Sequence, residues 1–332
     1  MQKKTILNIE TVYTANEFSA CGKTFVAGGS ETTPAVYLHD LAAGTSELVA
    51  DCPGGVMSFV PVPGIKDQYY SVQGLFPGFI GFEAGIYRHA KIDGAWKTEK
   101  VIELPFAHRC DVIEKDGVCY LFAASCSKYK ADPADWSKQG EVLVARVDEN
   151  GLAEEPKVIF TLGRNHGMLK AKVNGEDMIF VSGEQGIFYF DMNDGCKPVQ
   201  IFDKEVSEFG ILDMDGDGVE ELVAIEPFHG HMLNLYKRNG EAWELKFTDE
   251  LSFGHGLSCG VFNGEPIFVV GNRRGPLTLV KYSPKNVAEG IVEKEILEEE
   301  CGPTQTQVFN FDGTDYILSA NQLKKEVTLY SK

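Results

Sequence analysis

The sequence predicts an all-β fold, a seven-bladed β-propeller, and three observations lead to this prediction. First, a unit of short alternating or strongly apolar strands recurs seven times along the 332 residues. Second, turns rich in glycine, aspartate and asparagine separate the strands, and the chain contains 35 glycines, which is typical of short antiparallel strands. Third, the last unit is one strand short, while the N-terminus has one strand too many.

The seven units follow one another along the whole chain. They span residues 17–52, 57–104, 108–162, 166–203, 209–251, 255–299 and 304–332. Residues 4–14 form the additional strand, which we expect to complete the last blade, because a closed ring leaves no exposed sheet edge. A turn near residues 131–138 is the only expected helical feature. The sequence shows no Pro- or Ser-rich linker, and we predict one domain, residues 1–332.

Charge and hydropathy disfavour several classes of function. The chain has 31 Lys and Arg against 49 Asp and Glu, a formal net charge of −18, which repels the phosphate backbone of nucleic acids. Apolar runs are shorter than the roughly 18 residues that span a bilayer, and the N-terminus lacks the apolar segment of a signal peptide. We therefore expect neither nucleic acid nor membrane as a partner, and a cytoplasmic location. The eight cysteines form no CxxC pair, which favours reduced, buried thiols.

Blade five carries an acidic loop. Asp213, Asp215, Asp217 and Glu221 place carboxylates at positions 1, 3, 5 and 9 of a segment between two expected strands, and Ca²⁺ prefers such an array of oxygen ligands. The pattern FG-x-x-D-x-D-x-D-G over residues 209–218 resembles the FG-GAP/VCBS repeats of β-propellers. The array predicts a structural calcium ion that pins the hairpin. The alternative interpretation is an acidic β-turn without an ion.

Five of the seven histidines are expected on one rim of the propeller. The innermost strands of a propeller all begin on the same face, and the loops from second to third strands return to that face. His108, His166 and His255 lie at the starts of inner strands, and His229 and His231 lie in a returning loop of blade five. Neutral imidazoles are common ligands of Zn²⁺, Mn²⁺ or Fe²⁺, and three of them leave positions open for a substrate. A polar channel mouth filled with water is the alternative.

The expected metal ligands are His166, His229 and His231, with Glu226 or His255 as a fourth ligand or a hydrogen-bonding partner. In oligogalacturonate lyases a Gln-x-x-His-x-His segment and an upstream His hold the metal. The segment Glu226-x-x-His229-x-His231 with His166 is similar in order and spacing, with Glu in place of Gln. Aldos-2-ulose (anhydrofructose) dehydratases likewise combine FG-GAP/VCBS-like propeller repeats with metal sites. The resemblance implies a lyase or dehydratase that acts on a small carbohydrate-derived substrate, by β-elimination next to a carbonyl or carboxylate.

Such an elimination gives roles to further residues. A metal ion stabilises the enolate, a base removes the α-proton and an acid protonates the leaving oxygen. His108 and His255 are the candidates for base and acid, and Arg109 can hold a carboxylate or polarise a hydroxyl. The side chains expected to contact the substrate are Arg164, Arg273, Gln305, Gln307, Tyr129 and Trp136. The alternative function is a non-catalytic propeller that serves as a binding platform for a protein or another ligand.

Overall fold

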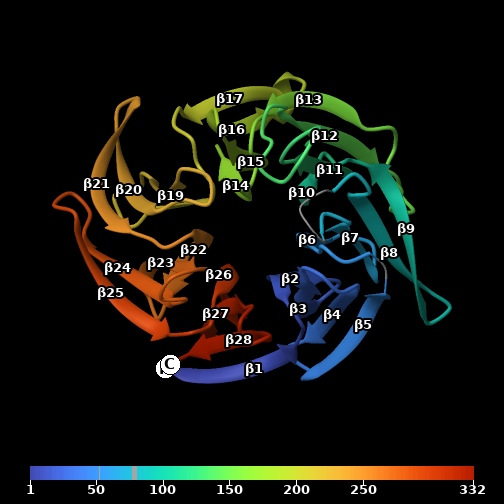
Figure 1. The fold of residues 1–332 in the computed structure, drawn as a ribbon, viewed down its shortest axis with the longest axis horizontal. Coiled ribbons are helices and arrows are strands. Elements are labelled where there is room, and N and C mark those ends of the chain that lie inside the picture. Colours follow the sequence, from blue (N-terminus) through green and yellow to red (C-terminus); the bar gives the residue numbers. More distant parts are fainter. Residues whose placement is uncertain (52, 77–80) are drawn as a thin grey trace.

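The computed structural model describes residues 1–51, 53–76 and 81–332, and it contains seven sheets of four antiparallel strands each. The sheets are arranged as blades around a central axis, and the chain runs once around the ring (Figure 1). In the first six blades, four consecutive strands pair in chain order from the innermost to the outermost. The prediction of an all-β, seven-bladed propeller is confirmed.

The strands of the seven blades have the following bounds. Blade one contains β2 (Val12–Ala20), β3 (Lys23–Ser30), β4 (Ala35–Asp40) and β5 (Thr45–Asp51). Blade two contains β6 (Ser58–Pro61), β7 (Gln68–Gln73), β8 (Gly85–Ile92) and β9 (Ala95–Glu103). Blade three contains β10 (Ala107–Lys115), β11 (Val118–Ser125), β12 (Gly140–Val147) and β13 (Lys157–Leu162). Blade four contains β14 (Met168–Val173), β15 (Glu176–Gly183), β16 (Gly186–Asp191), the 3-10 turn η1 (Met192–Asp194) and β17 (Lys197–Phe202).

The remaining three blades complete the ring. Blade five contains β18 (Phe209–Leu212), β19 (Glu221–Glu226), β20 (Met232–Asn239) and β21 (Ala242–Glu250). Blade six contains β22 (Gly254–Phe262), β23 (Glu265–Asn272), β24 (Leu279–Asn286) and β25 (Ile291–Glu298). Blade seven contains β26 (Pro303–Phe311), β27 (Thr314–Asn321), β28 (Glu326–Ser331) and β1 (Gln2–Asn8).

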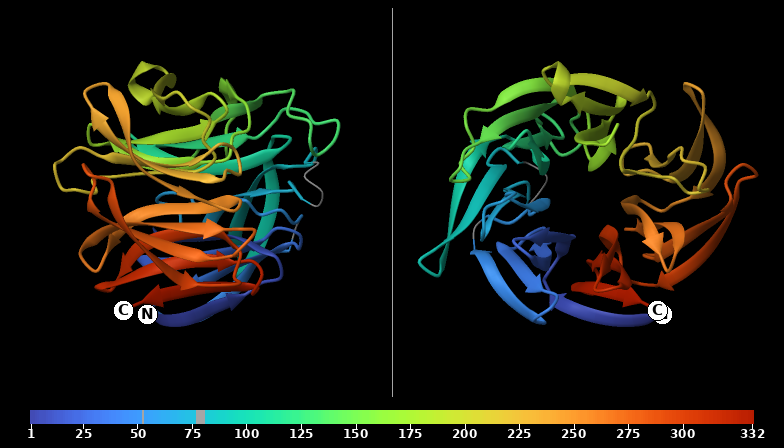
Figure 2. Two further views of the ribbon diagram at one scale, coloured as in Figure 1. Left: turned by 60° about the vertical axis from the view of Figure 1, so that its left-hand side comes forward. Right: turned by 180° about the vertical axis from the view of Figure 1, so that it is seen from behind.

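The N-terminal strand closes the last blade, as predicted. β1 pairs antiparallel with β28, from Gln2 opposite Ser331 to Asn8 opposite Glu326, and the two termini lie side by side at the rim (Figure 2). Leu7 is buried in a core cluster that blades seven and one share. The closing strand therefore contributes both backbone hydrogen bonds and apolar contacts.

Two details differ from the sequence-based expectations. The inner strand of blade one begins at Val12 rather than near Glu17, so Tyr13 belongs to β2 and not to the closing strand. The two strands separate at Thr11, which adopts a left-handed φ of 47°, and the apolar residues on both sides obscure this break in the sequence. Residues 131–138 contain turns and bends but no helix.

Within the described ranges, no helix is long and apolar enough to cross a membrane.

The cysteines of the described residues carry free thiols. Cys110, Cys126 and Cys301 are buried, and Cys21 is exposed. Burial raises the pKa of the Cys126 thiol to about 12, so this thiol stays protonated at neutral pH. Cys52 lies outside the described residues.

The apolar core lies between neighbouring blades. The second strands of the blades end in continuous buried runs, as in β3 and β11, because adjacent blades cover both faces of these strands. Outer strands such as β9 alternate between exposed and partly buried residues. The first residues of the inner strands consequently lie around the axis, far from the outer surface of the ring.

The closing strand provides a test of the fold. Replacing Leu7 by alanine (Leu7→Ala) removes buried apolar contacts and is expected to lower the free energy of unfolding by about 2–5 kcal/mol. The control is Leu245→Ala on the outer strand β21, where the leucine side chain is exposed, with an expected change within about 0.5 kcal/mol. Denaturant titration followed by circular dichroism measures both. Equal effects of the two substitutions would contradict the role of β1 in ring closure.

Candidate metal centre

The side chains of the site stand at equivalent positions of different blades, at the start of the innermost strands. His108 in β10 and His255 in β22 lie where the strand register shifts against its neighbour. Tyr13 in β2 and Thr304 in β26 lie at the same irregularity. A β-bulge re-aims the side chain of the extra residue. The repeated bulge therefore gives these four side chains an orientation that a regular strand would not.

A left-handed backbone residue stands two positions before each of three histidines. These residues are Phe106 (φ 57°), Arg164 (φ 52°) and Phe253 (φ 57°), which precede His108, His166 and His255 respectively. For residues other than glycine this conformation costs of order 1 kcal/mol, and it persists where the surrounding structure holds it. Each of these three turns therefore has a strained backbone that the surrounding structure holds in place, and it fixes the backbone position from which the histidine side chain extends.

His166 is the centre of a cluster of imidazoles. Its ring centroid lies 4.4 Å from that of His108, 4.7 Å from that of His255 and 4.8 Å from that of His229. His166, His229 and His255 can each offer one ring nitrogen so that the three atoms lie within 4.8 Å of one another. Metal–nitrogen distances of about 2.0–2.1 Å mean that binding of an ion would draw these three rings closer together.

His229 reaches the cluster from the loop between β19 and β20. It adopts a left-handed φ of 48°, and its backbone N–H donates a hydrogen bond of 3.1 Å to the hydroxyl of Ser207. The next residue, Gly230, leaves no room for a side chain, because a Cβ there would lie 2.3 Å from the carbonyl oxygen of Glu226. This tight turn directs the ring of His229 inward, against the rings of Phe228 and Phe253.

Hydrogen bonds to carbonyl groups define the tautomers of two histidines. Nδ1 of His255 lies 2.7 Å from the carbonyl oxygen of Thr304, and Nδ1 of His108 lies 3.2 Å from the carbonyl oxygen of His166. A carbonyl oxygen only accepts hydrogen bonds, so Nδ1 carries the proton in both rings. Nε2 of each neutral ring consequently carries a lone pair.

Glu208 defines the tautomer of His166. Its carboxylate oxygen lies 2.6 Å from Nδ1 of His166 and accepts a second hydrogen bond of 2.7 Å from Arg109. Nε2 of His166 then carries a lone pair, and it is buried without a hydrogen-bond partner among the described residues. A histidine that donates Nδ1–H to a carboxylate and leaves Nε2 free is the usual arrangement of a metal-ligating imidazole.

Arg109 and Glu208 hold this part of the ring together. Arg109 also donates to the carbonyl oxygens of His166 (2.9 Å) and Met57 (2.7 Å). Burial acts to lower the pKa of Arg109, but the Glu208 carboxylate outweighs it and raises the pKa. Burial also raises the pKa of Glu208, although Arg109 opposes this shift. The guanidinium is fully engaged within the protein, so Arg109 positions other groups and is not available as the predicted clamp for a carboxylate.

Tyr13 contacts two imidazoles from other blades. Its hydroxyl lies 3.1 Å from Nε2 of His255 and 3.4 Å from Nε2 of His108. Because both nitrogens carry lone pairs, the hydroxyl donates to one of them at a time. Burial raises the pKa of Tyr13, so the hydroxyl keeps its proton at neutral pH. Arg273 lies over the tyrosine ring, with 5.3 Å between its Cζ and the ring centroid.

The imidazoles of the cluster are neutral at pH 7. Burial holds the pKa values of His108, His166 and His255 well below 6.5, and the neighbouring histidines and arginines lower them further. Burial and the charge of Arg273 lower the pKa of His229 to about 3. Neutral imidazole is the form that binds a metal ion, so the cluster is already in that form.

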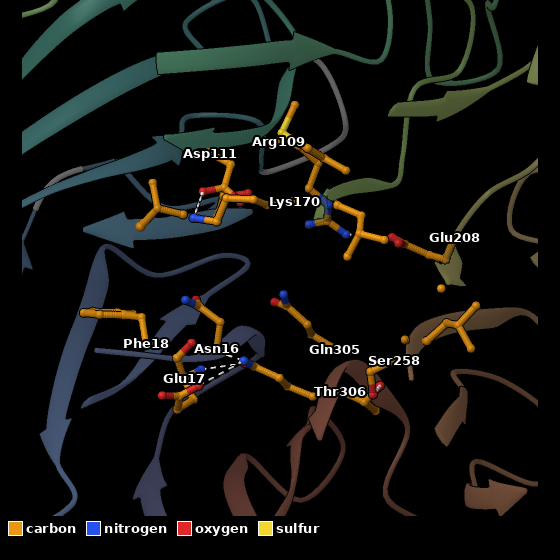
Figure 3. Close-up of a pocket in the computed structure, with 18 of the residues that line it drawn as sticks. Asn16, Glu17, Phe18, Arg109, Asp111, Lys170, Glu208, Ser258, Gln305 and Thr306 are labelled. Atoms are coloured by element: carbon orange, nitrogen blue, oxygen red, sulfur yellow. Dashed lines mark hydrogen bonds and ion pairs between the residues drawn. The ribbon is translucent and has the colours of Figure 1, made fainter. Parts of the chain in front are cut away.

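A cavity of about 540 Å³ lies along the central channel next to the cluster. Its inner end is lined by His255, Arg109 and Glu208, and its wall continues along the inner strands to the exposed residues Ser19 and Lys170. Polar and charged side chains from several blades project into it (Figure 3). The histidine cluster therefore has the cavity on one side and the loops between second and third strands on the other.

The structure does not bring all predicted ligands into the cluster. His231 is exposed, and the carboxylate of Glu226 accepts a hydrogen bond of 2.8 Å from Tyr236. Neither belongs with His166 in the group of converging nitrogens, whereas His255 does. The sharp turn at His229 is the reason, because the chain has left the axis two residues later.

The predicted substrate contacts divide between the two sides of the cluster. Gln305 and Gln307 line the cavity, where they accept hydrogen bonds from the backbone N–H groups of Ala15 (3.1 Å) and Glu17 (2.6 Å). They thereby join blade seven to blade one.

The other four predicted contacts lie in loops outside the lining of the cavity. Arg164 forms an ion pair with Glu205 (2.9 Å), and Arg273 pairs with Glu31 (2.7 Å). In the long loop of blade three, Trp136 packs on Phe228 with 4.9 Å between ring centroids. Tyr129 is half exposed and packs on Phe82, 5.6 Å away.

Two residues of the centre were not predicted from the sequence. Tyr13 was assigned to the closing strand because the break before Val12 was not recognised. Glu208 directly precedes the expected start of the inner strand of blade five. Moving the boundary by one residue would have identified Glu208, whereas Tyr13 requires the inner strand of blade one to begin at Val12 instead of near Glu17.

The acidic loop of blade five contains an internal cation. Ligand oxygens of Asp213, Asp215 and Glu221 lie within 4.8 Å of one another. The ammonium group of Lys237 in β20 lies 2.6 Å from Asp215, 2.8 Å from Asp217 and 3.0 Å from Glu221. Asp213 accepts hydrogen bonds from two backbone N–H groups of the loop. Lys237 can thus neutralise the carboxylates that were predicted to hold calcium, and a calcium ion would compete with its ammonium group for the same oxygens.

Comparisons with known proteins identify the fold. No protein-family model and no curated protein matches the chain. A chain of the mitotic checkpoint complex has a TM-score of 0.62 at 11% identity, covering 100% of this chain and 91% of that one. Sqt1 of Saccharomyces cerevisiae has a TM-score of 0.58 at 8% identity, covering 93% and 81%. The Dos1 propeller has a TM-score of 0.55 at 10% identity, covering 95% and 77%.

At these identities the similarity shows the β-propeller fold alone. The resemblance to FG-GAP/VCBS repeats and to carbohydrate lyases is not confirmed by these comparisons. Function has to be argued from the site.

The buried histidines predict a pH dependence of stability. The unfolded chain protonates its imidazoles near pH 6.5, whereas the folded cluster resists protonation, so stability falls as the pH drops below 6.5. Each such imidazole adds a slope of up to about 1.4 kcal/mol per pH unit. Denaturant titrations in EDTA between pH 7 and 5 should show this loss. The substitution His108→Gln should reduce the change in the free energy of unfolding per pH unit by up to about 1.4 kcal/mol, the contribution of one imidazole. An unchanged pH dependence of the free energy of unfolding would contradict the buried neutral state of His108.

The acidic loop gives a separate prediction. Lys237→Met removes the internal cation and leaves the carboxylates unneutralised, so the melting temperature should fall in EDTA and recover when Ca²⁺ is added. The wild-type protein should respond less to Ca²⁺, because Lys237 competes for the same oxygens. Lys246→Met, which removes a lysine paired with Glu244 alone, is the control. If Ca²⁺ stabilises neither wild type nor Lys237→Met, the loop is not a calcium site.

Proposed function

We propose that the protein is a metal-dependent enzyme whose ion is held by His166, His229 and His255. The observation that carries this proposal is the buried Nε2 of His166. It has no hydrogen-bond partner among the described residues, its ring is oriented by Glu208, and it lies with His229 and His255 in a group of converging nitrogens. A buried acceptor without a partner costs about 1–3 kcal/mol, and coordination of a cation removes this cost.

The residues fit a divalent transition metal such as Zn²⁺, Mn²⁺ or Fe²⁺. Three neutral imidazoles form the donor set, which suits these ions better than the hard cations Mg²⁺ and Ca²⁺. Three protein ligands also leave a coordination position for a substrate, as in catalytic rather than structural sites. Glu208 and the carbonyl oxygen of Thr304 hold the Nδ1–H groups of His166 and His255, which leaves the lone pairs on Nε2. The hydroxyl of Tyr13 lies 3.1 Å from Nε2 of His255 and would turn to Nε2 of His108 when His255 binds an ion.

The reaction that we propose is elimination of a leaving group next to a carbonyl or carboxylate of a sugar-derived molecule. A metal ion held by His166, His229 and His255 would supply electrostatic stabilisation of negative charge that develops on the substrate oxygen. Tyr13 keeps a proton on its hydroxyl and is our candidate for protonating the leaving oxygen, in place of one of the two histidines, His108 and His255, that the sequence predicts as base and acid. His108, a candidate base from the sequence, has its Nε2 3.4 Å from the same hydroxyl, and it would act as the base when that hydroxyl turns away. Arg109 and Glu208 orient the site and do not need to contact the substrate.

Metal analysis tests the proposal. The purified protein should contain about one transition-metal ion per chain, and His166→Ala and His229→Ala should lose it. His231→Ala is the matched control, since this histidine lies in the same loop but is exposed, and it should retain the metal. Retention of the metal in His166→Ala, or equal loss in His231→Ala, would exclude the proposed ligand set.

The chemistry is tested on a panel of uronic acid and keto-sugar derivatives. Elimination creates a conjugated double bond, whose ultraviolet absorbance should increase with the metal-loaded protein and remain constant with His166→Ala. A metal-free protein without activity on the panel that instead retains a protein partner through purification would favour the binding-platform function.

A further inference from the structure

The central channel contains a cavity, lined by polar and apolar side chains alike, that the fold does not fill. It measures about 540 Å³, within the range of small-molecule sites, and corresponds to a ligand of monosaccharide or disaccharide size. Its inner end is formed by buried residues such as His255 and Arg109, while Ser19 and Lys170 at its other end are exposed. A ligand can therefore enter along the channel from the side away from the loops and reach His255, the histidine of the cluster that lines the cavity.

The charges in the cavity disfavour an anionic ligand. Three carboxylates and two cations line the wall, namely Glu17, Asp111, Glu208, Arg109 and Lys170. Both cations are already paired, Arg109 with Glu208 at 2.7 Å and Lys170 with Asp111 at 3.3 Å. A carboxylate in the cavity would find no unpaired cation among these residues, and the same two ion pairs leave Glu17 as the one carboxylate of the five residues without a cationic partner. The lining therefore carries a net negative charge, which is unfavourable for an anion in a partly desolvated site.

The polar groups suit hydroxyl groups instead. Oδ1 of Asn16 is buried and has no hydrogen-bond partner among the described residues, while its Nδ2 is held by the carbonyl oxygen of Phe59 at 2.8 Å. An O–H donor from a ligand would satisfy this oxygen. Gln305 projects from the same side as Asn16, opposite Arg109 and Lys170, and Phe18 lies at the edge of this wall (Figure 3). Carboxylates and amides of this kind are complementary to the hydroxyl groups of a polyhydroxylated molecule.

We propose that the central channel binds an uncharged, polyhydroxylated ligand of monosaccharide or disaccharide size. The inference rests on the proposed function in one respect, because it names the substrate class of the same centre. It favours elimination next to the carbonyl of a neutral sugar over elimination in a uronic acid. Binding in the channel itself does not depend on a metal ion.

Calorimetry and ligand-detected NMR on the full-length protein test the proposal, with D-glucose, maltose and D-glucuronate as probes. At least one neutral sugar should bind, and D-glucuronate should bind at least about tenfold more weakly than glucose, which corresponds to about 1.4 kcal/mol. Glu17→Gln should narrow this difference, because it removes one of the repelling charges. Failure of all probes to bind at tens of millimolar, or equal or tighter binding of D-glucuronate, would overturn the proposal.

A cavity-filling variant locates the binding site. Ser258 lines the channel, and Ser258→Trp should abolish binding of the sugar, while Ser137→Trp in the exposed loop of blade three should not. Circular dichroism and the melting temperature establish that both variants are folded; if Ser258→Trp is not, Asn16→Leu replaces it, with the same expected loss. Sugar binding that persists in the folded channel variant would place the ligand elsewhere and refute the proposal.

Measurements with and without metal separate this inference from the proposed function. Sugar binding to a protein that takes up no metal would support the channel site and contradict the metal centre. Metal binding without sugar binding would support the metal centre and contradict the channel site.

Discussion

Closure of the ring by β1 against β28 is the constraint on which the histidine centre depends. A closed ring of seven blades places the start of every inner strand around one axis, so residues far apart in the chain become neighbours. The hydroxyl of Tyr13 and Nε2 of His255 are 242 positions apart in the sequence and 3.1 Å apart in space. The hydrogen bonds of Gln305 and Gln307 to β2 join blades seven and one in the same way. An open ring would have no equivalent contacts, and the bulges at the strand starts would direct their side chains into solvent.

The centre is a layer of buried polar groups that the fold largely satisfies from its own backbone. Carbonyl oxygens accept the Nδ1–H groups of His108 and His255, and Glu208 binds both His166 and Arg109. Burying so many polar groups is tolerable only when each has a partner. Nε2 of His166 departs from this pattern. Such departures concentrate at functional sites, where a ligand supplies the missing interaction, and this is the basis on which we propose a bound cation at the centre.

The sequence was sufficient for the fold and for the convergence of the histidines, because both follow from the order of strands. The repeating unit and the surplus N-terminal strand specify a closed seven-bladed ring, and strand order alone places His108, His166 and His255 at one end of it. Side-chain direction within a tight turn does not follow from strand order. Only coordinates show that His229 points inward while His231 is exposed. The partners of charged groups, such as Lys237 in the acidic loop, are equally invisible in the sequence, since they lie on neighbouring strands whose register is unknown beforehand.

The histidine layer lies between the loops and the channel, so the two sides of the centre differ in how accessible they are to a ligand. On the loop side the arginines are paired with carboxylates, and Trp136 packs on Phe228 next to His229, so this side is covered by the protein itself. On the channel side a cavity extends from exposed residues to His255. Approach along the channel would bring the substrate to an imidazole whose Nε2 faces Tyr13, with the loops closing the site behind it. In the elimination that we propose, exclusion of water from that covered end would strengthen the electrostatic stabilisation of an enolate.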